Sequence, residues 1–504
     1  MAKRVTTAEG IPVGSNLNAQ TAGQNGPMLI QDFHFLDKMA HFGRERTPER
    51  EVHAKGWGAH GKFTVTKDVT KWTKAKFLNE VGKETPVFLR FSSVAGELGR
   101  SDTERDPRGF ALKFYTEEGN YDMTGNNTPA FFIRDPMIFP EFIHAVKRDP
   151  VTHLRSATMF WDVISHLPES VFQTMITYSD RGIPESFRHM HGFSSHTFLL
   201  RNEKGEPVWT KLHFKTQQGI KNMDPERAKK MMGENPDFHG QDLREAIDRG
   251  EFPKWTLYFQ IIPYELAKTR ATELFDMTKV MKQEEFPLHE VGVLELNRNP
   301  NHYFAEVEQA AFNPGNLVPG IESSPDKMLQ GRLFSYQDTH RHRIGPNFFQ
   351  VPINRPIAPV HNHQESGFMY DRPLDKPADH INYFPNSFDG TWPEPESAKK
   401  DQGYNYAAED FQGGFTVGNY AYDDNFYEHP KNLWKIFDDG QKDRFCDNVA
   451  SHLAEMNDEI KGARKVQPDK VKEIQDRVIG LFLNVDPACG GGIRTKLDAY
   501  IAKK

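Results

Sequence analysis

Arg332, Tyr336, His340 and Arg343 are the side chains of this chain best spaced to do chemistry together. They are separated by four, four and three positions, and this spacing places them on one face of a helix. A free tyrosine keeps its proton up to a pH of about 10, but an arginine one helical turn away favours the phenolate. A phenolate is a hard anionic ligand that suits Fe(III). Because such a pair is more often structural, the spacing alone indicates only a cationic face that carries a phenol.

One helix must position that face, and the sequence predicts where it begins and ends. Ser324 is a good N-cap, Pro325 suits the first helical position, and Asp326 favours the positive end of the helix dipole. Gly345 and Pro346 are residues that stop a helix. We therefore expect a single helix between these two signals.

The string around Tyr336 is R-L-F-S-Y-Q-D-T-H, at positions 332–340. It resembles the proximal haem signature of the monofunctional haem catalases, in which a tyrosine binds the iron. Further matches to that family are F-G-R-E-R-T-P-E-R-E-V-H-A-K-G at 42–56, R-F-S-S-V-A-G-E at 90–97, D-P-R-G-F-A at 106–111 and G-N-N-T-P at 125–129. Several motifs in the right order are far more specific than any one of them. The resemblance covers roughly positions 20 to 420 and fades in the tail.

The resemblance implies an α+β protein with the catalase fold, in which an antiparallel β-barrel core is joined by an arm, a wrapping segment and a helical tail. The expected parts are an N-terminal arm carrying His53 at 1–53, the barrel at 54–298, the wrapping segment with the helix of Tyr336 at 299–415, and a C-terminal helical domain at 416–504. The arm is polar and without clear periodicity, so we expect it to be extended.

Local patterns agree with this organisation. Strand signals separated by turn residues favour a closed barrel, and Gly119-Asn120 is a hairpin signal. The strand-like runs are 87–92, 109–115, 209–214, 255–262 and 291–296, and helical stretches occur at 168–178 and 225–232. Two helical stripes follow in the tail, one of Phe445, Val449, Leu453 and Met456 and one of Val471, Ile474, Val478 and Leu481.

The resemblance also implies a haem pocket with two chemically different sides. Tyr336 would be the axial ligand of the iron, and Arg332 would keep its phenolate ionised. His53 and Asn126 would be the catalytic pair on the other side, where His53 moves protons and Asn126 holds the peroxide by hydrogen bonding. Ser92 would orient the imidazole of His53.

Other residues would hold the macrocycle and shape the way in. Arg90 and Ser92 alternate with Leu89 and Phe91, so both can point to one face of their strand. Arg50, Arg90 and Arg343 would pair with the haem propionates. Val52, Phe131, Phe139 and Phe312 match the positions that wall the macrocycle, and Val94, Asp106 and Pro107 match the access channel.

The implied activity is the disproportionation of hydrogen peroxide to water and dioxygen through an oxoferryl porphyrin radical, which protects cells from oxidative stress. The chain of 504 residues has no room for the large extra domain of the big-subunit catalases, so a small-subunit enzyme with haem b is expected. Members of the family are typically homotetramers with exchanged N-terminal arms.

NADPH is a second cofactor of some family members, and the residues point both ways. Ser179, Arg181 and Lys215 match positions used in nucleotide binding. At other such positions nucleotide-binding members often carry His, Trp and His, where this chain has Phe172, Met281 and Gln283.

Composition narrows the setting. A net charge of −7 gives no reason to expect a nucleic-acid partner, and no apolar run approaches a membrane span, so we expect neither nucleic acid nor membrane as a partner. The first residues lack an apolar signal region, and the two cysteines, Cys446 and Cys489, fit a reducing compartment. We therefore expect a cytoplasmic protein.

Three alternatives remain open at this level. An allene oxide synthase or a small haem peroxidase would use a similar tyrosine, histidine and asparagine. A non-enzymatic haem carrier would need the tyrosine but no distal proton relay. The His-x-His pairs 189/191, 340/342 and 361/363 could instead belong to a non-haem metal site.

Overall fold

The structure is a computed structural model that describes residues 4–372, 381–383, 387, 423–463 and 465–503. Its strands are β1 Gly56–Val65, β2 Glu84–Ser93, β3 Arg108–Thr116, β4 Gly119–Asn126, β5 Gly192–Phe193, β6 Phe198–Arg201, β7 Pro207–Thr216, β8 Lys254–Pro263, β9 Leu288–Arg298 and β10 Ile321–Glu322. Its α-helices are α1 Phe33–Phe42, α2 Phe139–Val146, α3 Ala157–His166, α4 Val171–Tyr178, α5 Pro225–Glu234, α6 Phe238–Asp248, α7 Ala267–Leu274, α8 Lys327–Arg343, α9 Glu428–Ile436, α10 Asp439–Lys461, α11 Pro468–Val485 and α12 Pro487–Ala502.

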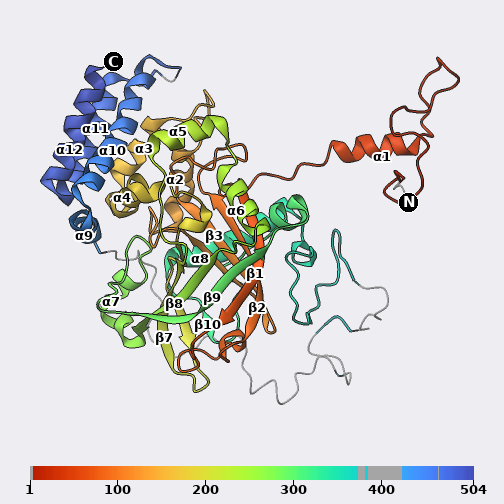
Figure 1. Ribbon diagram of the computed structural model, residues 1–504, viewed down its shortest axis with the longest axis horizontal. Helices are drawn as coiled ribbons and strands as arrows, with labels where there is room; N and C mark the ends of the chain where they lie inside the picture. The colour runs from red at the N-terminus through yellow and green to blue at the C-terminus, as the bar shows by residue number, and fades with distance from the viewer. Residues whose placement is uncertain (1–3, 373–380, 384–386, 388–422, 464, 504) are drawn as a thin grey trace.

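An antiparallel β-barrel forms the centre of the molecule (Figure 1). The strands follow the order β7-β5-β4-β3-β2-β1-β9-β8, and β8 pairs back with β7 to close the ring. Closure leaves these strands without a free edge. The predicted antiparallel barrel with a helical tail is therefore confirmed. Every predicted strand is present. The hairpin between β3 and β4 turns at Glu117–Glu118, two residues before the predicted Gly119-Asn120.

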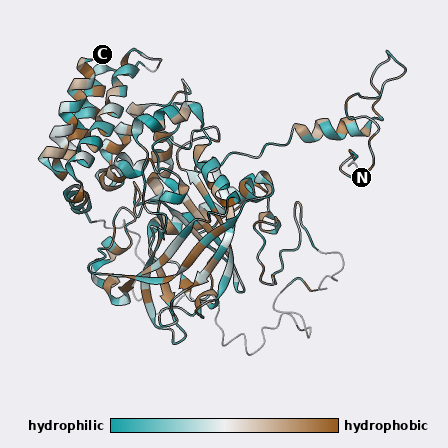
Figure 2. Cartoon of the chain, viewed as in Figure 1, coloured by the Kyte–Doolittle hydropathy of each residue, from teal (hydrophilic) through white to brown (hydrophobic). Residues whose placement is uncertain are grey.

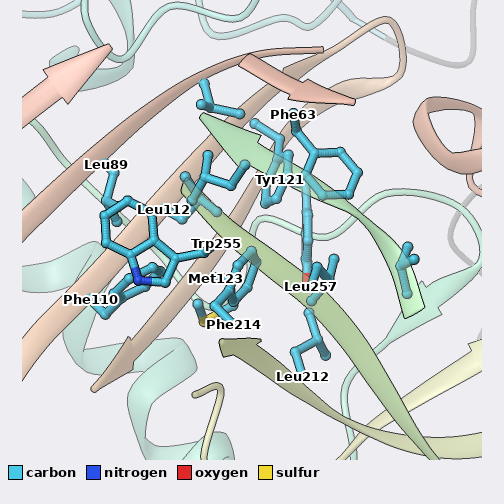
Figure 3. Packing of buried hydrophobic residues seen from close by; sticks show 14 of the residues in the cluster. Phe63, Leu89, Phe110, Leu112, Tyr121, Met123, Leu212, Phe214, Trp255 and Leu257 are labelled. Carbon is cyan, nitrogen blue, oxygen red and sulfur yellow. The ribbon is translucent and has the colours of Figure 1, made fainter. Parts of the chain in front are cut away.

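Aromatic and aliphatic side chains fill the barrel (Figure 3). Phe91 stacks on Phe187 with ring centroids 4.9 Å apart, and Phe110 packs edge-on against Phe91 and Trp255. All of these residues are buried. Nine of the 38 phenylalanines of the chain belong to this packed interior, and their burial stabilises the barrel.

The tail helices pack on the helices next to the barrel rather than on the barrel itself. Helices α10, α11 and α12 lie side by side (Figure 1), and α10 and α11 both contact α3. Both predicted stripes face this contact, and all their residues are buried except Leu481, which is half-buried. The predicted boundary between residues 415 and 416 lies outside the described residues.

The expectation of an extended arm was wrong in one respect. Residues 33–42 form helix α1, whose N-cap Asp32 accepts a hydrogen bond from the Phe35 N–H. This helix stands away from the barrel (Figure 1), and Figure 2 shows hydrophobic residues along it. None of its residues is buried, and Phe33, Met39 and Phe42 are all more than half exposed.

Helix α8 also begins later than predicted. Its N-cap is Asp326, not Ser324, because the Asp326 carboxylate accepts hydrogen bonds from the Met328 and Leu329 N–H groups. The hydroxyl of Ser324 instead accepts from the Asp326 N–H. The end of the helix is as expected, since it stops at Arg343 and Gly345 takes a φ of 123°.

Among the described residues, no helix combines the length and apolar character that a membrane span requires.

Candidate active site

One cavity of about 410 Å³ brings the predicted site residues together. It lies between helix α8, barrel strands β2 to β4 and the segments before β1 and after β9. Its wall contains all of the predicted catalytic, cofactor-binding and metal-binding residues: Arg50, Val52, His53, Arg90, Ser92, Asn126, Phe131, Phe139, Phe312, Arg332, Tyr336 and Arg343. Val94 and His340 also line it.

The register of the barrel explains how three of these positions meet. Ser92 on β2 is opposite Gly109 on β3, and Gly109 is opposite Asn126 on β4. The three residues therefore form one row across adjacent strands, on the face away from the packed interior. Gly109 keeps the row open, because a Cβ atom there would lie 2.2 Å from Ser92 Oγ and 2.6 Å from His53 Nδ1.

His53 is held from several directions. Its side-chain Nδ1 lies 2.9 Å from Ser92 Oγ, and its backbone N–H donates to the Val94 carbonyl oxygen at 3.0 Å. Arg90 Nη1 donates to the His53 carbonyl oxygen at 2.9 Å. The backbone of His53 has a φ of 63°, which is unusual for any residue but glycine. Strain of this kind gathers at functional sites.

The electrostatic setting keeps His53 neutral. Burial, and to a smaller extent the positive charges of Arg90 and Arg332, lower the pKa of His53 from 6.5 to about 3. A neutral imidazole can accept a proton, and its bond to Ser92 leaves Nε2 as the nitrogen available for that task.

Tyr336 stands at the end of a chain of hydrogen bonds. Arg332 Nη2 donates to Tyr336 Oη at 2.7 Å, one helical turn away as the spacing predicted, and also to the Thr124 carbonyl oxygen. Arg332 Nη1 donates to His196 Nε2 at 2.7 Å, and His196 Nδ1 donates to Asp326 Oδ2 at 2.7 Å. Because guanidinium can only donate, this network fixes the His196 tautomer with its proton on Nδ1.

Both inner members of that chain are fully enclosed. His196 and Asp326 are each 1% exposed. Burial alone would raise the pKa of Asp326, but His196 and Lys211 outweigh it and hold that pKa below its usual value. Burial lowers the pKa of His196, so the ring stays neutral between a carboxylate and a guanidinium.

A cluster of arginines surrounds one carboxylate at another part of the wall. Glu308 Oε1 accepts from Arg343 Nη2 at 2.9 Å and from Arg50 Nη1 at 3.2 Å. Burial, together with Arg90 and Arg343, lowers the pKa of Arg50. Arg90 Nε and Arg343 Nη1 are buried and find no hydrogen-bond partner among the described residues. Unused donors of this kind call for a further anionic acceptor.

His340, which the sequence left without a role, fastens the wrapping segment. Its Nε2 donates to the Phe312 carbonyl oxygen at 2.7 Å, and burial lowers the pKa of His340 to about 4. Asp122 on β4 accepts from the Asn313 N–H, and Lys113 on β3 pairs with Asp122. The ring of Phe312 is therefore fixed from both sides at the cavity wall.

The predicted channel residues separate into two groups. Val94 lines the cavity, whereas Asp106 and Pro107 are not part of its wall. Asp106 Oδ2 accepts from the N–H groups of Val94 and Ala95 at 2.7 and 2.9 Å, and from Arg100. Asp106 thus sets the shape of the loop that carries Val94.

Three contributors were missed from the sequence. His196 and Asp326 complete the chain behind Tyr336, and Glu308 stands among the arginines. The His-x-His pairs do not assemble a metal site in the described residues, where no group of three metal-binding side chains gathers. His191 Nδ1 accepts from the Thr216 N–H, and His189 Nδ1 lies 3.0 Å from the Gly219 carbonyl oxygen.

Comparison with known proteins defines the class. Residues 6–390 match the family described as catalase, and residues 421–497 match the family described as catalase-related immune-responsive. The chain is 48% identical over 503 residues to catalase A of Pseudomonas putida, with 100% of both chains covered. It is 50% identical over 495 residues to the catalase of the Onchocerca volvulus endobacterium, with 98% of both covered.

Solved structures agree with the sequence comparison. A fungal catalase crystal structure aligns with a TM-score of 0.89 at 41% identity, covering 99% of this chain and 97% of that one. Catalase A from Saccharomyces cerevisiae aligns with a TM-score of 0.86 at 40% identity, covering 98% and 99%. The chain is therefore an enzyme that decomposes hydrogen peroxide, and it belongs to the catalase family. The expected fading of the resemblance in the tail was wrong, because the tail has its own family match.

Proposed function

We propose that this chain is a haem catalase that converts two molecules of hydrogen peroxide into two of water and one of dioxygen. The observation that carries the proposal is the cavity that holds Tyr336 with Arg332 on α8 together with His53, Ser92 and Asn126. One side of such a pocket offers an anionic ligand and the other a neutral proton acceptor.

The residues of the cavity fit haem b. The guanidinium groups of Arg50, Arg90 and Arg343 line the cavity, and the two haem propionates are anionic groups that they could bind. The unpartnered Arg90 Nε and Arg343 Nη1 would be the donors that they engage. Phe131, Phe139 and Phe312 supply flat apolar surface. When bound, the haem supplies the redox-active iron at Tyr336.

Arg332 would hold Tyr336 as the anionic ligand. Its Nη2 donates a charge-assisted hydrogen bond to Tyr336 Oη at 2.7 Å, the oxygen that would bind the iron. His196 and Thr124 fix both ends of the Arg332 guanidinium, so that its direction toward the phenolate does not vary.

His53 would move a proton between the two oxygens of the first peroxide. Its Nε2 takes the proton from one oxygen and returns it to the other, so that the O–O bond breaks with water as the leaving group. The side-chain amide of Asn126 would hold the peroxide by donating to it, without titrating in its place. The second peroxide gives up two electrons and two protons and leaves as dioxygen, and these reduce the oxygen atom that remains from the first peroxide to the second water.

The absorption spectrum of the purified protein tests the haem and its ligand together. We expect a ferric haem spectrum with phenolate ligation in the wild type. Tyr336→Phe should lose haem or bind it without the phenolate signature. A wild-type spectrum in Tyr336→Phe would remove Tyr336 as the ligand.

We propose that this chain does not retain NADPH. Arg181 and Lys215 form a basic pair, and burial together with Arg181 lowers the pKa of Lys215 to about 8. However, Phe172 is buried against His429, and Met281 is buried in an apolar cluster with Trp209. These apolar residues offer a nucleotide no hydrogen bonds. The purified protein should show no fluorescence of bound NADPH, and such fluorescence would contradict this proposal.

The setting is also a proposal. We propose a small-subunit homotetramer in the cytoplasm, with the parts 1–53, 54–298, 299–415 and 416–504 acting as arm, barrel, wrapping segment and helical domain, and without nucleic-acid or membrane partners. The exposed apolar side chains of α1 support assembly, because a second copy could cover them. Light scattering of the purified protein gives the number of subunits.

A further inference from the structure

A buried lysine lies behind the hydrogen-bond chain that leads to Tyr336. Lys211 on β7 is 5% exposed, and its Nζ donates to the Ser195 carbonyl oxygen at 2.7 Å. Another buried lysine of the barrel, Lys113, pairs directly with the Asp122 carboxylate at 2.8 Å. The ammonium of Lys211 instead donates to a backbone carbonyl oxygen, although the burial of an ammonium is unfavourable because the group loses its hydration.

The carbonyl that Lys211 holds belongs to a strained turn. Ser195 has a φ of 59°, in the region that side-chain-bearing residues rarely adopt. The turn is closed by the His196 N–H, which donates to the Ser194 carbonyl oxygen at 2.7 Å. A three-residue turn with a positive central φ is an unfavourable conformation that the surroundings must impose.

The surroundings do impose it, from both neighbouring elements. Ser195 Oγ donates to the Thr128 carbonyl oxygen at 3.1 Å, and Ser194 Oγ accepts from the Leu212 N–H at 3.0 Å. Lys211 is the charged member of this set. The residue that emerges from the turn is His196, whose two ring nitrogens bind Asp326 and Arg332.

We propose that Lys211 is a positioning residue for the proposed iron ligand, because it holds the strained Ser195 turn that aims His196 at Arg332. The inference rests on the proposed role of Tyr336. Lys211 acts only through others, since the turn sets His196, His196 fixes Arg332, and Arg332 donates to the phenolate. Burial lowers the pKa of Lys211 to about 8, and the carboxylate of Asp326 opposes that effect, so the ammonium is kept where the turn needs it.

Lys211→Met tests the proposal in haem-loaded protein, because it keeps the length and apolar stem but removes the donor. We expect the phenolate bands in resonance Raman spectra to weaken and haem to pass to haem-free myoglobin several-fold faster than from the wild type. Lys279→Met is the matched control: it removes a buried lysine that pairs with Asp423 outside this network. It should leave the phenolate bands unchanged even if it lowers the melting temperature.

A second variant distinguishes a positioning role of Lys211 from a general contribution to the stability of the fold. Lys211→Arg keeps a charged donor for the Ser195 carbonyl oxygen, so its phenolate bands should lie closer to those of the wild type than the bands of Lys211→Met. Wild-type phenolate bands and a wild-type rate of haem loss in Lys211→Met would overturn the proposal. If Lys211→Met does not fold, Lys211→Leu, which also lacks a donor, gives the same test. Absence of phenolate bands in the wild type would instead refute the proposed function.

Discussion

The carboxylate of Asp326 caps helix α8 and also binds His196. Its Oδ1 accepts from the N–H groups of Met328 and Leu329 at 2.9 and 3.2 Å, and its Oδ2 accepts from His196 Nδ1 at 2.7 Å. The residue that begins the helix of Tyr336 therefore also fixes the tautomer of the ring that supports Arg332. The N-cap of helix α8 and the hydrogen-bond chain that leads to Tyr336 therefore share one carboxylate.

Replacing that carboxylate should produce two separable effects. Asp326→Ala loses the cap, which costs about 0.5–2 kcal/mol, and also loses the partner of His196. Asp326→Asn can still cap through its side-chain oxygen but cannot offer His196 an anionic acceptor. We expect Asp326→Asn to keep more of the free energy of unfolding than Asp326→Ala, while both alter the spectrum of bound haem. Urea unfolding and absorption spectra measure the two effects, and an unchanged spectrum in both variants would contradict the network.

Gly109→Ala should damage catalysis through His53. The added Cβ would come within 2.2 Å of Ser92 Oγ and 2.6 Å of His53 Nδ1, so the imidazole must move. Misplacing a catalytic group by about 1 Å can cost about 10²-fold in rate, and we expect a loss of that order in oxygen evolution. Gly233→Ala is the control, because nothing lies within 4 Å of its added Cβ. Equal activity of the two variants would show that the contact at Gly109 is unimportant.

His53→Ala should keep haem and lose turnover. Removal of a positioned proton acceptor costs about 10² to 10⁴ in rate, while Tyr336 and the arginines remain to hold the cofactor. The readouts are the haem content from the spectrum and the initial rate of oxygen release. Near-wild-type release would exclude His53 as the proton relay.

Acid should destabilise the fold through its buried histidines. Burial lowers the pKa of His53, His191 and His213 from 6.5 to about 3, and that of His340 and His452 to about 4. The unfolded chain therefore binds more protons than the folded chain below about pH 6.5, so stability is full above that pH and falls as the pH drops toward 4. Urea midpoints between pH 7 and pH 4 measure this fall. His340→Gln, which cannot titrate, should have a shallower slope, and a slope identical to the wild type would refute the contribution of His340.

Local spacing is the reason the sequence revealed so much of the site. Arg332 and Tyr336 are one helical turn apart, and Arg90 and Ser92 are two strand positions apart, so each pair shares a face whatever the rest of the fold does. The motif strings then placed His53 and Asn126 in the same pocket. Strand and helix periodicity gave the barrel and the tail because burial repeats along each element.

What could not be predicted depends on long-range contacts or on competing local signals. His196 is 136 residues from Arg332 and 130 from Asp326, and no local pattern relates them. Ser324 and Asp326 are both good N-caps, and the contact of Asp326 with the distant His196 has no trace in the local sequence. Helix α1 was missed because its Gly- and Asn-rich flanks mask a short helix without a buried face.

The ratio of oxygen released to peroxide consumed is the sharpest test of the proposed catalase reaction. Purified, haem-loaded protein is given hydrogen peroxide without any organic donor, and both species are followed in the same vessel. The proposed function predicts rapid release of one dioxygen for every two peroxides. Consumption of peroxide only when an organic donor is added would indicate a peroxidase, and a haem-loaded sample that releases no oxygen would refute the proposed function.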